Sequence, residues 1–320
     1  FDELFANGTT TGCVYSSSHM EATDAFFAES ERRGARMAAG KTMMDRNAPA
    51  GVLDTAKRGY DESRALIERW HGRGRQIYAV TPRFAITSSP EQLEAAGALA
   101  RENPTCLVQT HLSENHAEIA AVEGLFPHAL DYTDVYEGFG LVGPRTLLGH
   151  CIHLDVREWR ALSERGAVAV HCPTSNLFLG SGLFDLAAAR EAARPVRVAV
   201  ATDVGGGTSY SMLRTMAEAY KVQQLRGLSV APRDAFHMAT RGNALAMGLG
   251  GTVGGLDAGH EADFVVLDSR ATPAMAQRMA TARTLDEELF VLMTLGDDRA
   301  VAETYVAGRP SKPRGDRAIE

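Results

Sequence analysis

The chain has 320 residues, of which 45% are hydrophobic and 23% charged, and its formal net charge is −7. This composition is that of a globular protein with a large core, and the negative charge argues against nucleic acid and anionic membranes as partners. No apolar stretch approaches the roughly 18 residues of a membrane span. The four cysteines form no Cys-x-x-Cys pair, which favours a reducing cytoplasm over a disulfide framework.

Short apolar or β-branched segments alternate with longer charged segments of helical period through most of the chain. The strand-like segments are residues 9–15, 36–43, 76–80, 105–110, 146–150, 167–171 and 196–202. Helical segments lie between several of them, at residues 90–101, 114–125, 155–165 and 209–226. Nearly continuous apolar strands separated by helices predict an α/β protein with a parallel sheet covered on both faces. Seven such units fit a (β/α)8 TIM barrel that lacks its first strand in this chain better than a doubly wound sheet.

The character of the sequence changes near Gly250, so residues 1–250 and 251–320 are predicted to form separate parts. A turn-rich segment at 251–259 precedes a strand-like segment at 262–268, and a second one follows at 303–308, after a helical stretch at 273–295. Because two isolated strands cannot make a stable sheet, we interpret them as remnants of a small β-sandwich subdomain whose other strands are expected upstream of Phe1. A polar tail begins at Ser311.

Three strand-like segments lead into a residue that can bind a metal or move a proton: His111, His150 and Asp203. In a TIM barrel the active site lies at the C-terminal ends of the strands. Neutral imidazole is a common zinc ligand, and a carboxylate beside a metal can accept a proton from bound water. A single strand-end histidine is more often bonded to backbone, and an aspartate before glycines is often only a turn former. Their joint occurrence favours a metal-dependent hydrolase.

Further polar residues follow the same predicted strands. Glu114 lies three residues after His111 at the start of a predicted helix, which places both on one face. The helix dipole alone would favour an acid there, but a functional Glu114 would carry protons between water and substrate. His171 is expected to orient metal ligands by hydrogen bonding. The planar fork of Arg83 suits a carbonyl or carboxylate of a ligand, and the alternative is a solvated arginine at the rim.

Other chemistries find less support in the sequence. Gly180-Ser181-Gly182 is interpreted as a plain turn, because no Gly-x-Ser-x-Gly nucleophile elbow is present. His153 is expected to face the loop that follows its strand. The glycines between Gly248 and Gly259 do not follow a strand in the dinucleotide-binding pattern. No Pro-Cys-x-x-Cys occurs, so a deaminase would need a barrel-type site.

The segments that carry these residues resemble the bacterial guanine deaminases of the amidohydrolase superfamily. The resemblance covers nearly the whole chain, and its most specific parts are Pro82-Arg83-Phe84 and residues 176–184. It implies a cytosolic homodimer that converts guanine to xanthine and ammonia with one Zn²⁺ per subunit. Together with the net charge, it leads us to expect neither nucleic acid nor a membrane as partner. It also implies zinc ligation by His111 and Asp203.

The same resemblance implies the catalytic and substrate-binding roles. Asp203 would accept the proton of the attacking water, Glu114 would protonate the purine ring, and His150 would hydrogen-bond the water or the developing charge. Arg83 and Phe84 would hold the purine, with Arg83 on its carbonyl. His111, Glu114 and Asp203 would also line the substrate site.

One departure from the family pattern concerns the metal. The family supplies two zinc ligands from a His-x-His after the first barrel strand, and this sequence opens at Phe1 and contains no His-x-His. We therefore expect the chain to lack that N-terminal segment, which leaves the site short of the usual three protein ligands. Two alternatives stay open. One is a related aminohydrolase or chlorohydrolase acting on another heterocycle, and the other is a truncated, non-catalytic member.

Overall fold

The computed structural model of the protein describes residues 1–313, which pack into two compact units. The first, here the barrel unit, comprises residues 11–171 and 179–199. The second, here the C-terminal unit, comprises residues 1–10, residues 172–178 and the chain from Val200 onward. Packing thus groups segments that lie far apart in the sequence. The boundary predicted near residue 250 was drawn from sequence character and stays a prediction.

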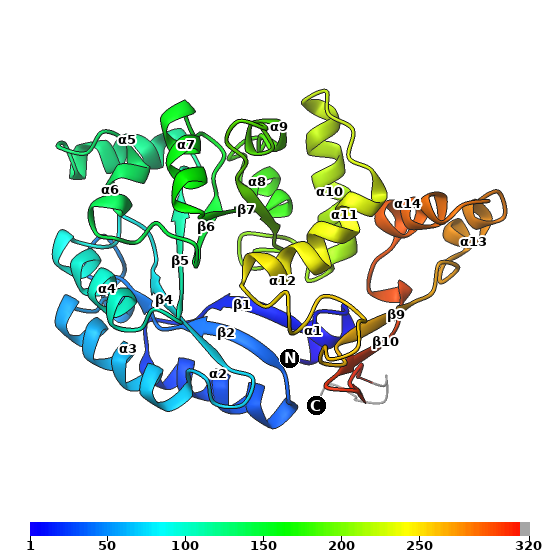
Figure 1. Ribbon diagram of the computed structural model, residues 1–320, viewed down its shortest axis with the longest axis horizontal. Coiled ribbons are helices and arrows are strands. Elements are labelled where there is room, and N and C mark those ends of the chain that lie inside the picture. Colours follow the sequence, from blue (N-terminus) through cyan, green and yellow to red (C-terminus); the bar gives the residue numbers. More distant parts are fainter. Residues whose placement is uncertain (314–320) are drawn as a thin grey trace. The chain divides into compact units, whose positions relative to one another are not determined.

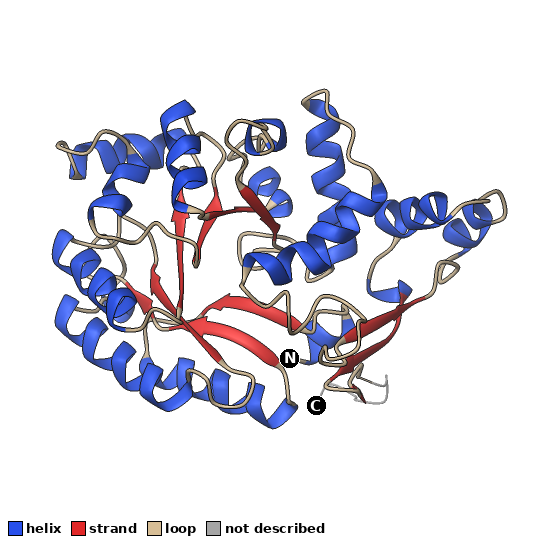
Figure 2. Ribbon diagram, viewed as in Figure 1, coloured by secondary structure: helices blue, strands red, loops and turns tan. Residues whose placement is uncertain are grey.

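The barrel unit is built on a curled sheet of parallel strands (Figures 1 and 2). Over the described residues the neighbours follow the order β1-β2-β4-β5-β6-β7-β8, with β3 paired to β4. Every segment predicted as a barrel strand corresponds to a strand here, and the predicted α/β, TIM-barrel-like class is confirmed. The strands are β1 (Thr11–Tyr15), β2 (Arg36–Gly40), β3 (Thr42–Met43), β4 (Ile77–Pro82), β5 (Leu107–Leu112), β6 (Thr146–His150), β7 (Val168–His171) and β8 (Arg197–Val200).

Helices alternate with these strands, and α2, α3 and α4 lie along the outside of the sheet (Figure 1). Strand side chains such as Tyr78, Val80 and Leu107 are fully buried, as expected for a sheet covered on both faces. The helices are α2 (Met20–Arg33), α3 (Ala56–Trp70), α4 (Pro90–Glu102), α5 (His116–Leu125), α6 (Tyr132–Gly138), α7 (Val156–Arg165) and α9 (Leu186–Ala189), with a 3₁₀ turn at Ala50–Val52.

Helix α5 begins later than the periodicity suggests, because Asn115 is its N-cap. The Asn115 side chain accepts from the backbone N–H of Glu118, and the Glu118 carboxylate accepts in return from the N–H of Asn115, which completes a capping box. The acid that benefits from the helix terminus is therefore Glu118. Glu114 lies before the helix, so the structural explanation considered for it does not apply, and its side chain is left for other contacts.

The C-terminal unit combines a small antiparallel sheet with helices. In the described chain this sheet has the order β11-β10-β9, and α1 packs on β10, where the Thr304 hydroxyl donates to the Phe5 carbonyl at 2.6 Å. The predicted helical stretch 273–295 is two helices, because Thr284 starts a new one with its own capping box. The predicted polar tail lies outside the described residues from 314 onward.

The elements of this unit are α1 (Asp2–Ala6), α8 (Pro173–Phe178), α10 (Met212–Leu225), α11 (Pro232–His237), a π-helical turn (Met238–Gly242), α12 (Asn243–Ala246), β9 (Phe264–Leu267), α13 (Pro273–Met279), α14 (Leu285–Leu295), a 3₁₀ turn (Asp298–Ala300), β10 (Val301–Val306) and β11 (Arg309–Pro310). Within residues 1–313, none of the helices in either unit combines the length and apolar character that a membrane span requires.

Candidate active site

Unusual backbone conformations gather where barrel strands end. Ser113, His150 and Cys151 have φ angles of 48°, 73° and 50°, in the left-handed region that non-glycine residues rarely adopt. Hydrogen bonds tie the two strand ends together, since the Cys151 N–H donates to Leu112 O at 2.9 Å and the Ile152 N–H to Ser113 O at 3.1 Å. Strained backbone persists where its surroundings impose it, and it is concentrated at functional sites.

His111 has the tautomer and charge of a metal ligand. Its Nδ1 lies 2.7 Å from the Arg83 carbonyl oxygen, and because a carbonyl can only accept, Nδ1 carries the proton and Nε2 keeps its lone pair. Burial, and to a smaller extent the nearby His150, lowers the pKa of His111 to about 3, so the ring is neutral at pH 7. A histidine that ligates a metal typically donates its other ring N–H to such an acceptor. His111 therefore fits a zinc ion.

His150 and Glu114 lie beside His111 in the barrel unit. The rings of His111 and His150 stack with centroids 5.3 Å apart and an interplanar angle of 23°. His150 is buried, and its Nε2 lies 3.7 Å from Oε2 of Glu114, a distance that suits an electrostatic contact. Two imidazoles and one carboxylate are thus gathered at the ends of β5 and β6, which is the chemistry needed to hold and move protons.

Arg83 and Phe84 follow β4 at the same strand ends. The Phe84 ring lies 5.9 Å from the His111 ring, and Cζ of Arg83 lies 5.1 Å from the centroid of Phe84. The Arg83 side chain is exposed and pairs with no carboxylate in the described part of the chain; its Nη1 contacts Sδ of Met44 at 3.7 Å. The guanidinium donors are therefore available to a carbonyl or anionic group of a ligand.

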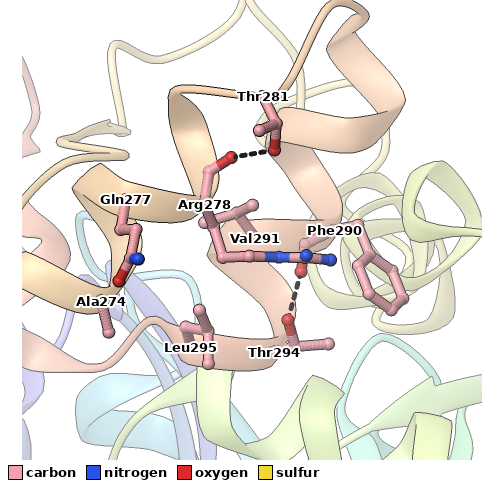
Figure 3. A pocket seen from close by; sticks show the side chains of 8 residues that line it. All are labelled: Ala274, Gln277, Arg278, Thr281, Phe290, Val291, Thr294 and Leu295. Carbon is pink, nitrogen blue, oxygen red and sulfur yellow. Dashed lines mark hydrogen bonds between the residues drawn. The ribbon is translucent and has the colours of Figure 1, made fainter.

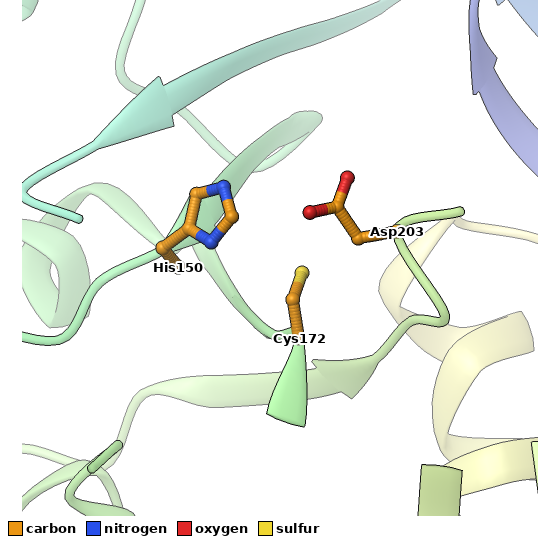
Figure 4. A group of neighbouring side chains, drawn as sticks. All are labelled: His150, Cys172 and Asp203. Carbon is orange, nitrogen blue, oxygen red and sulfur yellow. The ribbon is translucent and has the colours of Figure 1, made fainter. Parts of the chain in front are cut away.

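Asp203 belongs to the C-terminal unit, in the turn after β8. Its φ is 48°, and its carbonyl accepts from the Gly207 N–H. A Cβ at position 207 would lie 2.0 Å from the Thr202 carbonyl oxygen, so only glycine closes this turn. Figure 4 draws Asp203 with Cys172 of the same unit and with His150 of the barrel unit. The Cys172 sulfur lies within 4.8 Å of an Asp203 carboxylate oxygen. The sequence reasoning did not single out Cys172, which is a possible metal ligand by residue type.

His171 ends β7 as predicted, but it makes none of the expected orienting hydrogen bonds. Its ring is buried and stacks on Phe184, with centroids 4.6 Å apart and an interplanar angle of 17°. Neither ring nitrogen has a hydrogen-bond partner among residues 1–313. Burial lowers the pKa of His171 to about 3, with a smaller contribution from His150. Two buried ring nitrogens without partners lower the stability of the folded state.

The sequence did not indicate two residues near the predicted acid Glu114. Ser181 contacts Glu114 directly, and His153 contacts Ser181. The Ser181 hydroxyl donates to Oε1 of Glu114 at 2.8 Å, and His153 Nε2 donates to the Ser181 carbonyl at 2.8 Å. Ser181 lies in the segment interpreted as a plain turn. A serine between two glycines gives no local signal for a partner 67 positions away.

A hollow on the surface of the C-terminal unit holds none of the predicted site residues. Its volume is about 670 Å³, and it lies between helices α13 and α14 (Figure 3). It is lined by Ala274, Gln277, Arg278, Thr281, Phe290, Val291, Thr294 and Leu295. None of these side chains is a histidine, a cysteine or a carboxylate, so the lining has neither the metal ligands nor the acid–base groups expected at the strand ends.

Comparison with known proteins identifies the protein family of the chain. The model of the amidohydrolase family matches residues 1–310, and the chain belongs to this family. Guanine deaminase of Escherichia coli (strain K12) is 49% identical over 307 residues, which are 96% of this chain and 70% of that protein. The predicted resemblance to bacterial guanine deaminases is therefore confirmed.

Solved structures agree with this assignment. The structure of E. coli guanine deaminase matches with a TM-score of 0.95, covering 96% of this chain and 72% of that one. The structure of guanine deaminase from C. acetobutylicum with bound guanine in the active site matches with a TM-score of 0.87 at 28% identity, covering 96% and 73%. Deaminases of this family are metalloenzymes, in line with the ligand state of His111.

Proposed function

We propose that this protein hydrolyses guanine to xanthine and ammonia with one Zn²⁺ per subunit. The observation that carries the proposal is the strand-end group of His111, His150 and Glu114 in a chain 49% identical to a guanine deaminase. We further infer a cytoplasmic homodimer whose partner is guanine rather than nucleic acid or a membrane. The net charge of −7 supports the last point.

The zinc ion would be held by Nε2 of His111 and a carboxylate oxygen of Asp203. A bound Zn²⁺ supplies a positive charge that lowers the pKa of a coordinated water towards about 7. Support for His111 comes from its neutral ring and its bond to the Arg83 carbonyl. Two protein ligands are fewer than the roughly three usual at catalytic zinc, and the sequence holds no His-x-His. The zinc content of the purified protein therefore tests whether these ligands suffice, independently of turnover.

The reaction replaces the bond between the purine carbon and the exocyclic amino nitrogen by a bond from that carbon to a water oxygen. Asp203 would take one proton from the water, and this proton would reach the ring nitrogen through Glu114. Glu114 would then take the second water-derived proton from the new hydroxyl group and deliver it to the departing amino nitrogen, which leaves both carboxylates ionised again. His150 would donate a hydrogen bond to the water oxygen. Arg83 would bind the purine carbonyl through its guanidinium, which pairs with no carboxylate among residues 1–313, and Phe84 would pack against the ring.

Ammonia release and metal analysis together test the proposal. Purified protein should release ammonia from guanine in preference to adenine, cytosine and an s-triazine, and should carry about one tightly held zinc per chain. Preference for another heterocycle would favour a related aminohydrolase or chlorohydrolase. Protein with neither zinc nor turnover of any of these substrates would favour a non-catalytic member.

Replacing Asp203 by Asn tests the assigned base, because the amide cannot accept the proton. We expect turnover of guanine to be lost while the thermal unfolding midpoint stays close to that of the wild type. Near-normal deamination by this variant would refute the role given to Asp203. Ser163→Ala, which removes an exposed hydroxyl bonded to Pro195 O, serves as a control substitution.

A further inference from the structure

The two carboxylate oxygens of Glu114 have different surroundings. Oε1 accepts a hydrogen bond from the Ser181 hydroxyl at 2.8 Å, while Oε2 lies 3.7 Å from Nε2 of His150. Glu114 precedes helix α5, and its backbone N–H is occupied by the Glu118 carboxylate at 2.9 Å. A glutamate side chain outside a helix has several rotamers, and ordering it costs conformational entropy. The Ser181 hydroxyl restrains this one.

Ser181 is itself firmly held. It is 8% exposed, and its carbonyl accepts from Nε2 of His153 at 2.8 Å. The ring of His116 packs on the His153 ring with centroids 4.0 Å apart. Gly182 has a φ of 135°, and a Cβ there would lie 2.9 Å from Cγ2 of Ile152 and 3.2 Å from Cε1 of His153. The turn thus docks tightly against the residues that follow β6.

We propose that Ser181 is a positioning residue for proton transfer by Glu114, and that His153 keeps Ser181 in place. The proposal rests on the proposed function, because it concerns the acid of that reaction. A hydrogen bond from a hydroxyl to a carboxylate is stronger than one between neutral groups. By occupying Oε1, Ser181 fixes the rotamer and leaves Oε2, on the side of His150, as the oxygen that receives and delivers protons.

Kinetics of three serine variants test this proposal. Ser181→Ala should lower kcat for guanine by about 10- to 100-fold, a part of what general acid–base catalysis contributes, with little change in KM. Ser181→Thr keeps the hydroxyl and should recover most of the lost rate. Ser163→Ala removes a serine hydroxyl that donates to the Pro195 carbonyl at 3.0 Å, and it should behave as the wild type. A purely structural serine would show its effect in the unfolding midpoint rather than in kcat.

Variants of His153 test the second half of the proposal. His153→Gln keeps an N–H donor that can reach the Ser181 carbonyl, whereas His153→Ala has none. We expect kcat to fall in His153→Ala and to be largely retained in His153→Gln. Equal loss in both variants would show that His153 acts in some way other than holding Ser181.

Crystal structures provide a readout that does not depend on turnover. In Ser181→Ala the Glu114 side chain should occupy more than one rotamer, while in the wild type and in Ser163→Ala it should occupy one. If the wild type failed to deaminate guanine, the proposed function would be wrong. The number of Glu114 rotamers in the crystal structures of the wild type and Ser181→Ala would still decide whether Ser181 positions that side chain. Unchanged kcat together with a single Glu114 rotamer in Ser181→Ala would overturn the inference. Should that variant not fold, Ser181→Cys, a weaker donor of similar size, takes its place.

Discussion

A buried ion pair formed by the residue that follows β2 allows a quantitative prediction. Lys41, between β2 and β3, and Asp54 have side chains with 0% exposure, and they form a salt bridge. Each has a second partner: Glu62 lies 3.4 Å from the Lys41 amine, and Nε of Arg58 lies 2.7 Å from the other Asp54 oxygen. Removing one partner of a buried pair typically costs roughly 3–5 kcal/mol, because the other charge is left uncompensated.

The two single variants should differ, because the remaining partners differ. Asp54→Asn leaves Lys41 with only Glu62, whose side chain is 29% exposed, so we expect a loss of about 3–4 kcal/mol. Lys41→Met leaves Asp54 bonded to Arg58 and to the Thr55 N–H at 2.8 Å, so we expect about 1–2 kcal/mol. The larger loss should therefore follow removal of the acid.

Urea unfolding at pH 7 measures both losses as changes in the free energy of unfolding at constant m-value. Lys57→Met is a matched control, because Lys57 lies on helix α3, which also carries Arg58 and Glu62, and pairs with Asp61 at the surface, with side-chain exposures of 85% and 48%. That variant should be indistinguishable from the wild type. A larger loss for Lys41→Met than for Asp54→Asn would refute the reasoning from residual partners.

Two further predictions concern the strand ends themselves. Arg83→Lys should raise KM for guanine by about 10-fold with kcat nearly unchanged, because the planar fork is lost while the charge remains; an unchanged KM in steady-state assays would remove Arg83 from the substrate site. The second concerns pH. Burial lowers the pKa of His171 to about 3 in the folded protein, whereas in the unfolded chain it is about 6.5. As the pH falls below about 6.5, the unfolded chain binds a proton that the folded chain does not bind, so the metal-free protein loses stability. Between pH 7 and pH 5, His171→Asn should remove about 2 kcal/mol of that fall, because the slope approaches its limit of about 1.4 kcal/mol per pH unit only below about pH 6.5. An identical fall for both proteins in urea titrations over this range would contradict this.

Much of the fold could be predicted because the signals for strands and helices lie within short stretches of the sequence. Strand β6 occupies the predicted residues 146–150, since a short apolar run ending in a polar residue defines a buried strand. The start of α5 was predicted two residues too early, although the signal was present: Asn115 followed three residues later by Glu118 is a capping box. Periodicity alone does not distinguish a capping residue from the first residue of the helix.

The strand-end histidines could be predicted for a different reason. A parallel strand delivers its last side chains to one edge of the sheet whatever its loops do, so β5 and β6 bring His111 and His150 within 5.3 Å between ring centroids. Their protonation could not be predicted in the same way. The low pKa of His111 follows from burial and from the neighbouring His150, while its tautomer follows from the bond to the Arg83 carbonyl, which depends on how β4 and β5 are paired.

The contacts of Glu114 could not be predicted from short stretches of the sequence. Its partner Ser181 is 67 residues away in a segment with neither helical nor strand periodicity, and its conformation depends on the contact between Gly182 and the residues after β6. Turn residues report a bend in the chain, but they do not report the surface against which the bend packs. A serine between glycines therefore becomes a functional candidate only when its hydroxyl is seen to donate to the acid, because that donation is a property of tertiary packing.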